Sequence, residues 1–261
     1  MNILFIGDVC GRSGRDALFE RLNDIQYEYN IDMTIANGEN SAGGLGITRK
    51  TYEEMTKAGV DFFTLGNHAF SKANDITALF AAGENIVRPE NMLPEGLPGN
   101  GMEIVRAKNG VRVAVINLIG SVFMQEAKDP FKTAEALIMS AKEKADVVIV
   151  DFHAEATSEK EAMGFFLDGK VSAVIGTHTH VQTADEKILP HGTAYITDVG
   201  MTGAEYSILG MEVEAALSRY LAPEKKSKFK SAEGKTRFCA VVIDVDEKLG
   251  TARGIKRIWR S

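Results

Sequence analysis

Four of the five histidines lie in three short segments, and two further polar segments carry acidic and amide side chains. In chain order, the five segments are Gly7-Asp8, Asn37-Gly38-Glu39-Asn40, Gly66-Asn67-His68, Asp151-Phe152-His153 and Gly176-Thr177-His178-Thr179-His180. Carboxylates, amide oxygens and imidazoles are ligands for Mn²⁺, Fe²⁺ and Zn²⁺. Any one segment alone is more often a helix cap or a buried polar residue than a ligand. Together they predict a metal centre, because burying so many ionisable groups without cations is costly.

The spacing of the last two histidines favours two ions over one. His178 and His180 are two residues apart, so on a regular strand their side chains would face opposite ways. In a tight loop, with Gly176 giving the backbone freedom, each could reach one of two adjacent ions. Two ions ~3.5–4 Å apart need a bridging ligand. Glu39 or Asp8 could supply that bridging carboxylate.

The five segments follow short apolar runs that are typical of buried strands. We predict strands at residues 3–6, 33–36, 62–65, 147–150 and 171–175, and helices at 48–57, 133–144 and 157–167. Hairpins are predicted at 102–118, around an Asn-Gly turn, and at 239–259. Alternating strands and helices with added hairpins indicate a layered α/β fold. Ligands of such folds bind beyond the carboxyl ends of the strands, so the five segments are expected to converge there.

The chain of 261 residues is predicted to form one domain, 1–261. Residues 83–101, rich in proline and glycine, are expected to form an irregular excursion. Residues 11–14, which contain two glycines, are interpreted as a tight turn, with Arg12 or Arg15 as candidate substrate contacts. The basic run at 225–230 is interpreted as a solvated loop.

Composition narrows the classes of partner. The formal net charge of −6 argues against the broad basic surface that duplex DNA or RNA requires, but not against a small phosphate ester held by metal cations. Two cysteines provide no disulfide framework. No apolar run approaches the ~20 residues of a membrane span, and Asp8 interrupts the apolar start, which is wrong for a secretory signal. A cytoplasmic protein without a membrane partner is expected.

The order of the segments resembles that of the calcineurin-like metallophosphoesterases. Three positions depart from the usual pattern: Cys10 stands where a histidine ligand is common, Glu39 replaces the bridging aspartate, and Thr177 replaces a glycine. These departures, together with the segments 11–15, 37–44 and 198–203, resemble the YmdB-type subfamily. The resemblance extends from about residue 2 to the end of the chain.

This resemblance implies a four-layer α/β/β/α sandwich with two mixed sheets and a two-metal site at one edge. One ion would be held by Asp8, Glu39, Asn40 and His180. The other would be held by Glu39, Asn67, His153 and His178, so that Glu39 is shared. The ions are expected to be iron or manganese, with zinc as the alternative. Cys10 is interpreted as a small buried residue, with a thiolate ligand as the alternative, and Asp151 as structural or as support for a ligand.

The implied activity is hydrolysis of cyclic nucleotides, above all 2′,3′-cyclic nucleoside monophosphates, by attack of a metal-bound hydroxide. His68 follows a ligand directly and is predicted to be the catalytic proton donor, because a sugar alkoxide leaves poorly unless it is protonated. The alternative is that His68 orients Asn67. A phosphomonoesterase or nucleotidase, and a nucleotide-sensing regulator, are the rival functions. A free cyclic nucleotide and an RNA end with a 2′,3′-cyclic phosphate are both candidate substrates. Assembly into a homo-oligomer is a further possibility.

Overall fold

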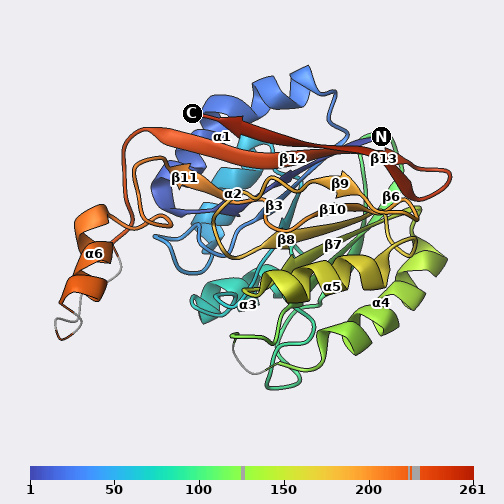
Figure 1. The fold of residues 1–261 in the computed structure, drawn as a ribbon, viewed down its shortest axis with the longest axis horizontal. Helices are drawn as coiled ribbons and strands as arrows, with labels where there is room; N and C mark the ends of the chain where they lie inside the picture. The colour runs from blue at the N-terminus through green and yellow to red at the C-terminus, as the bar shows by residue number, and fades with distance from the viewer. Residues whose placement is uncertain (125–126, 223, 225–229) are drawn as a thin grey trace.

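The computed structural model describes residues 1–124, 127–222, 224 and 230–261 (Figure 1). Most of the basic run at 225–230 lies outside the described residues. The helices are α1 (Gly11–Glu28), α2 (Arg49–Ala58), α3 (Ala73–Ala81), α4 (Pro130–Lys144), α5 (Thr157–Leu167) and α6 (Val213–Leu221). The strands are β1 (Asn2–Ile6), β2 (Asp8–Val9), β3 (Met33–Asn37), β4 (Phe62–Thr64), β5 (Met102–Arg106), β6 (Arg112–Ile119), β7 (Val147–His153), β8 (Ala173–Thr177), β9 (Lys187–Ile188), β10 (Ala194–Ile196), β11 (Met201–Ala204), β12 (Thr236–Asp246) and β13 (Thr251–Arg260).

The strands form two mixed sheets. The first has the order β2-β11-β12-β1-β3-β4, with β13 paired to β12, and the second has the order β5-β6-β7-β8-β10-β9. In the first sheet β1, β3 and β4 are parallel, and in the second β6, β7, β8 and β10 are parallel. The hairpins β5–β6 and β12–β13 add antiparallel pairs. The expected α/β fold with two mixed sheets is confirmed.

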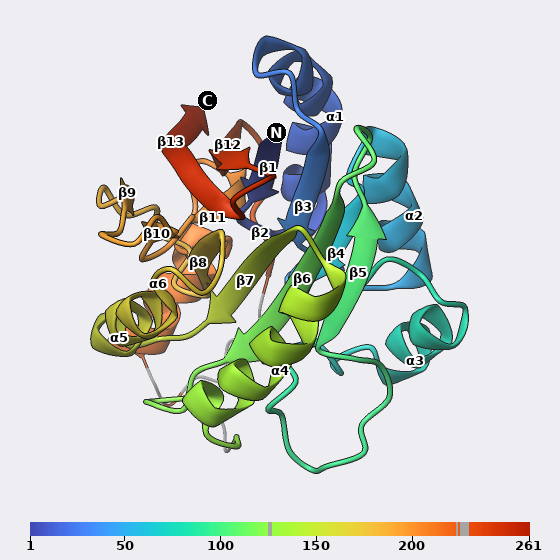
Figure 2. The same ribbon diagram turned by 90° about the vertical axis from the view of Figure 1, so that its right-hand side faces the viewer.

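Three apolar cores separate four layers, and β1 shows why its sequence is continuously apolar. Ile3 and Phe5 pack between the two sheets, whereas Leu4 and Ile6 pack under α1 and α2. Successive side chains of a strand point to opposite faces, so a strand covered on both sides needs apolar residues at every position. A third core joins the second sheet to α4 and α5. Figure 2 shows α1 and α2 on one side of the sheets and α4 and α5 on the other.

The sequence located most of these elements to within a few residues, and α5 to the residue. Helix α2 begins after Thr48 with a capping box to Thr51 and ends at Gly59 in the left-handed conformation, as its glycine indicated. Residues 83–101 hold no helix or strand of the structure. Among the described residues, no helix is both long and apolar enough to cross a bilayer.

The interpretation of residues 11–14 as a tight turn is wrong, because α1 begins at Gly11. Gly14 has no positive φ, and its role is close packing instead. A Cβ there would lie 2.6 Å from the carbonyl oxygen of Thr202. The glycine therefore lets a helix lie directly against β11, a requirement that sequence spacing does not reveal.

Candidate metal centre

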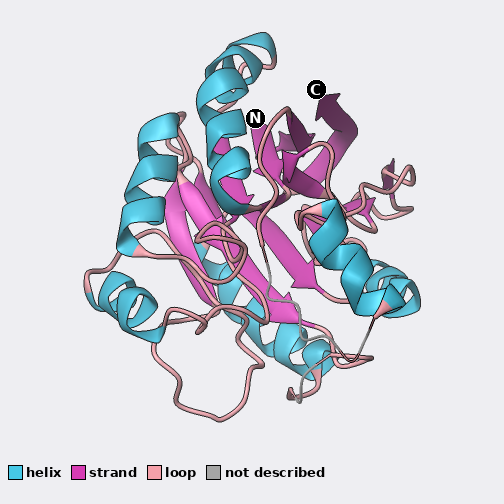
Figure 3. Ribbon diagram, turned by 90° about the vertical axis from the view of Figure 1, so that its left-hand side faces the viewer, coloured by secondary structure: helices cyan, strands magenta, loops and turns pink. Residues whose placement is uncertain are grey.

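The carboxyl ends of strands from both sheets meet at one edge of the molecule. Figure 3 faces the side from which α6 projects, where loops lie in front of the strands. Asp8 begins β2, Glu39 and Asn40 follow β3, and Asn67 follows β4. His153 ends β7, and the segment with His178 and His180 follows β8. The candidate site therefore draws on both sheets.

One group of donor atoms surrounds Nε2 of His153. Glu39 Oε1, Asn67 Oδ1 and His178 Nδ1 each lie 3.0 Å from this nitrogen. The potential ligand atoms of Glu39, His153 and His178 all lie within 4.8 Å of one another. These four residues are the set expected for the second ion.

The residues expected for the first ion lie beside this group and leave two oxygens without partners. Asp8 Oδ1 and Asn40 Oδ1 are buried and accept no hydrogen bond from any described residue, although buried polar atoms normally have a partner. His180 Nε2 lies 3.8 Å from Asp8 Oδ1. A divalent cation would satisfy both oxygens, so this donor set fits a metal.

A hydrogen-bonded chain fixes the tautomer of His153. Thr177 donates its hydroxyl proton to Asp151 Oδ1 at 2.7 Å, and its oxygen lies 2.8 Å from His153 Nδ1. Because the hydroxyl proton is already committed, Nδ1 must carry the proton and donate it to Thr177. Nε2 of His153 is then the nitrogen that faces the cluster, and it would bind a metal in place of its own proton. Asn37 donates to the other oxygen of Asp151 at 3.2 Å. Asp151 thus orients the candidate ligand His153 through Thr177. Sequence reasoning assigned no role to Thr177 or Asn37.

The other two histidines are oriented in the same way. His178 Nε2 lies 3.2 Å from a carboxylate oxygen of Glu155, which leaves Nδ1 facing the cluster. His180 Nδ1 lies 3.1 Å from the carbonyl oxygen of Leu209, which leaves Nε2 facing Asp8. The role of Glu155, two residues after His153, was missed at the sequence level.

The electrostatics of the pocket favour a cation. Burial alone would lower the pKa of His153, but Glu39, Asp8 and Asp151 raise it to about 9. Burial alone would raise the pKa of Glu39, but His153 and His68 lower it to about 2. Burial and the neighbouring His153 lower the pKa of His178 to about 3, which keeps it in the neutral form that binds metals.

A buried ion pair holds the loop that carries the last two histidines. Asp198 Oδ2 accepts hydrogen bonds from the amide and hydroxyl of Thr179, at 3.0 and 2.8 Å, and from Lys160 Nζ at 2.7 Å. His178 and His180 have φ of 102° and 65°, which non-glycine residues rarely adopt and which costs about 1–3 kcal/mol each. Asp198 therefore anchors Thr179 between two strained residues.

Gly176 does not supply the backbone freedom that was expected of it. Its φ is not positive, and a Cβ there would lie 1.8 Å from the carbonyl oxygen of Thr197.

Gly66 is required beside the cluster, because a Cβ at that position would lie 2.3 Å from Nε2 of His153. We expect Gly66→Ala to displace this ring and to lower metal affinity about 10–100-fold, the usual effect of disturbing the support of a ligand. Metal titration of the purified protein measures the change. Gly254→Ala is the matched control, because nothing lies within 4 Å of its Cβ and its φ is not positive. Wild-type affinity in Gly66→Ala would contradict this geometry.

Cys10, Arg12 and Arg15 are the other residues for which the sequence suggested a role at the site. Cys10 is buried, and a Cβ at Gly210 would lie 2.4 Å from its sulfur. Burial raises the pKa of this thiol to about 12, which favours the small buried residue over the thiolate. Arg15 Nε forms an ion pair with Glu54 Oε2 at 2.6 Å. Neither Arg12 nor Arg15 lines the cavity that opens at the candidate metal centre. The substrate contacts suggested for these two arginines are therefore not supported.

A cavity of about 500 Å³ opens at the centre and has two kinds of wall. Glu39, Asn40, His68, His178 and His180 line one part. The other part includes Arg219 and Tyr220, which the projecting helix α6 contributes (Figure 1). A polar ligand with an aromatic group would fit between the candidate metal ligands on one side and a cation and an aromatic ring on the other.

Comparisons with known proteins agree over nearly the whole chain. A family model described as YmdB-like protein matches residues 4–258. A Bacillus subtilis (strain 168) protein named 2′,3′-cyclic-nucleotide 2′-phosphodiesterase is 49% identical over 258 residues, covering 99% of this chain and 96% of that protein. A solved structure of a hypothetical protein from Thermus thermophilus has a TM-score of 0.92 and 43% identity, covering 100% and 99% of the two chains. A structure described as a novel phosphatase from Mycoplasma pneumoniae has a TM-score of 0.92 and 32% identity, covering 100% and 93%.

Proposed function

The chain belongs to the YmdB-like protein family, and from this premise we propose that it is a two-metal phosphodiesterase that hydrolyses 2′,3′-cyclic nucleoside monophosphates. The observation that carries the proposal is the convergence of Glu39, His153 and His178 beside two buried oxygens that lack partners. A relative of nearly the same length that is 49% identical and named for this activity supports the choice of substrate.

We assign Asp8, Glu39, Asn40 and His180 to one ion, and Glu39, Asn67, His153 and His178 to the other. Iron or manganese is proposed, with zinc as the alternative, because oxygen and imidazole donors suit all three. When bound, the two cations offset charge on the phosphoryl oxygens and lower the pKa of a water molecule. A cytoplasmic location and self-association stay predictions.

His68 is proposed to donate the proton that the leaving sugar oxygen requires. Its Nε2 lies 3.2 Å from Asn67 Nδ2, an N–H donor, so Nε2 accepts and Nδ1 can carry the proton. Its backbone N–H donates to Glu39 Oε2 at 2.8 Å, which fixes the residue beside the bridging carboxylate. The contact with Asn67 is also what the orienting alternative requires, so an experiment must separate the two roles.

The opposite wall of the cavity is proposed to bind the nucleotide. Arg219 has no ion-pair partner among the described residues, and its guanidinium can meet a phosphate or a base. Tyr220 offers an exposed ring on which a base can stack. A bound substrate would lie between these side chains and His68.

Removal and return of the metal, combined with a substrate panel, tests the function. We expect chelation to abolish turnover, and Mn²⁺ or Fe²⁺ to restore it. The reconstituted enzyme should hydrolyse 2′,3′-cyclic AMP faster than 3′,5′-cyclic AMP, and should release little inorganic phosphate from AMP. Faster turnover of AMP would indicate a nucleotidase. Tight binding of 2′,3′-cyclic AMP without turnover at any metal concentration would indicate a sensor.

A further inference from the structure

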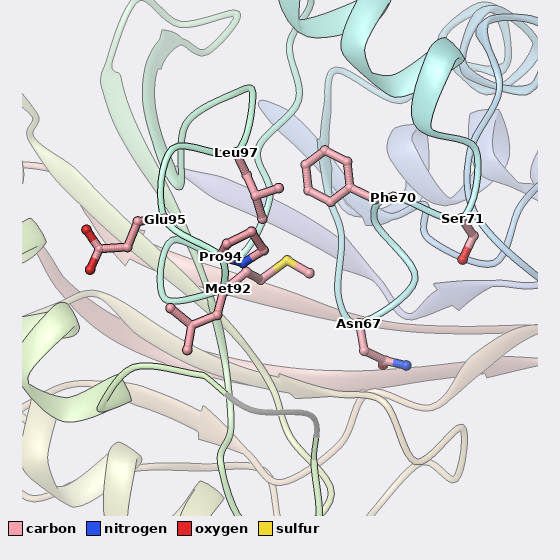
Figure 4. Close-up of a pocket in the computed structure, with 8 residues that line it drawn as sticks. Asn67, Phe70, Ser71, Met92, Pro94, Glu95 and Leu97 are labelled. Atoms are coloured by element: carbon pink, nitrogen blue, oxygen red, sulfur yellow. The ribbon is translucent and has the colours of Figure 1, made fainter.

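A second cavity, of about 890 Å³, lies on the other side of the strand-end loop after β4. Figure 4 shows Phe70 facing Leu97 and Met92 across it, with Asn67 at its edge. The irregular segment 83–101 forms the opposite wall and contributes Met92, Leu93, Pro94, Glu95 and Leu97. Most of the side chains that line the whole cavity are apolar, and one of them, Phe70, is aromatic. Apart from Asn67 at its edge, no residue that lines this cavity has a role in the proposed chemistry.

The two cavities are joined through a pair of neighbouring residues. Asn67 lines the second cavity, while its Oδ1 lies 3.0 Å from His153 in the metal centre. Its Nδ2 lies 3.2 Å from His68, which lines the first cavity. A ligand that reaches from one cavity to the other would therefore pass the proposed proton donor.

Size indicates that the second cavity is not needed for a mononucleotide. Protein pockets of ~300–1,000 Å³ hold one drug-sized ligand. The cavity at the metal centre, at about 500 Å³, can hold a single cyclic nucleotide. The second cavity is wider and more open to solvent, and it offers a separate surface for a further nucleoside. A substrate that fills both must continue beyond the terminal nucleotide.

The lining suits an unstacked base. Bases of single-stranded RNA stack on aromatic side chains and pack on apolar ones, and Phe70, Met92 and Leu97 offer such surfaces. The carboxylate of Glu95 would repel a phosphodiester, but it is paired with Lys128 Nζ at 2.6 Å. Lys128 therefore offsets part of the negative charge at this rim, because it lies beside one of the two carboxylate oxygens of Glu95.

We propose that this second cavity binds the base of the nucleotide preceding the cyclic phosphate, and that the substrate class is RNA ending in a 2′,3′-cyclic phosphate. The inference rests on the proposed phosphodiesterase function and extends its substrate. The terminal nucleotide lies in the cavity at the metals, and the chain continues past Asn67 to Phe70.

The test compares kcat/KM for 2′,3′-cyclic AMP with that for the dinucleotide ApA ending in a 2′,3′-cyclic phosphate. We expect the wild-type enzyme to prefer the dinucleotide by about 5–150-fold, the range that one base–aromatic stack contributes. Phe70→Ala should bring this ratio close to one. Because the Phe70 ring also packs on Phe80 at 6.5 Å, Leu97→Ser serves as a second variant that keeps this contact.

Phe19→Ala is the matched control, because Phe19 is 51% exposed on α1 and outside both cavities. It should keep the wild-type ratio. Equal kcat/KM for the two substrates in the wild type, or an unchanged ratio in both cavity variants, would overturn the inference.

Failure of the proposed function gives a different result, namely no turnover of either substrate by the metal-loaded protein. The subsite is then tested by fluorescence anisotropy with the dinucleotide carrying a 5′ fluorescein. Weaker binding by Phe70→Ala and Leu97→Ser than by Phe19→Ala supports the subsite. Equal binding by all three variants overturns it.

Discussion

Replacing His68 with alanine is expected to leave both metal ions bound and to lower kcat for 2′,3′-cyclic AMP by about 10²–10⁴-fold. The physical reason is the leaving group: a sugar alkoxide is a strong base and leaves slowly without a proton. His68 can supply that proton from Nδ1, because Nε2 faces the amide donor of Asn67. Metal content by elemental analysis, together with steady-state kinetics, measures both parts of the expectation.

The choice of substrate separates proton donation from an orienting role. A p-nitrophenyl phosphodiester releases a weakly basic phenolate that needs little protonation, so His68→Ala should retain most of its activity on it. An orienting role predicts instead that metal is lost and that both substrates slow equally. His191→Ala is the control, because His191 is an exposed residue paired with Asp168 at 2.8 Å, away from the centre. If His68→Ala loses metal and its turnover of both substrates falls equally, His68 is not the acid.

Replacing Lys160 with methionine is expected to lower the free energy of unfolding by about 3–5 kcal/mol, the cost of leaving a buried charge without its partner. Lys160 is 1% exposed and Asp198 is fully buried, so water cannot take the place of the ammonium group. The same change should weaken metal binding, because Asp198 holds Thr179 between His178 and His180. Urea denaturation and metal titration measure the two effects.

Two further variants sharpen this test. Lys160→Met/Asp198→Asn removes both charges and should regain part of the stability, but not the metal affinity, because the anchor of Thr179 is altered. Arg112→Met removes one partner of an exposed pair, Arg112–Asp146, whose N–O distance is 2.8 Å, and should stay close to wild type in both measurements. Wild-type metal affinity in Lys160→Met would show that the loop holds its shape without the ion pair.

The fold was largely predictable because its signals are local. Apolar runs such as residues 3–6 belong to strands buried on both faces, and such runs are visible without knowing the partner strand. The start of α1 was not predictable, because Gly11 and Gly14 are turn signals by local rules. Gly11 does adopt a left-handed φ of 62°, as a turn glycine would, although a helix begins there. Gly14 does not, and its task is close contact with Thr202, far away in the chain, so no window of sequence contains it.

The amino-acid order is enough to identify the side chains that can offer ligand atoms and the strands that they follow, from Asp8 to His180. The folded structure is needed to see how these side chains are oriented. It placed Thr177 and Asp151 behind His153, Glu155 behind His178, and Leu209 behind His180. It also decided that Lys160 of α5 anchors the loop after β8, and that the segment 83–101 faces Phe70. The physical reason is that ligand types are a property of each residue alone. Protonation, strain and cavities arise from atoms that the chain brings together from distant positions.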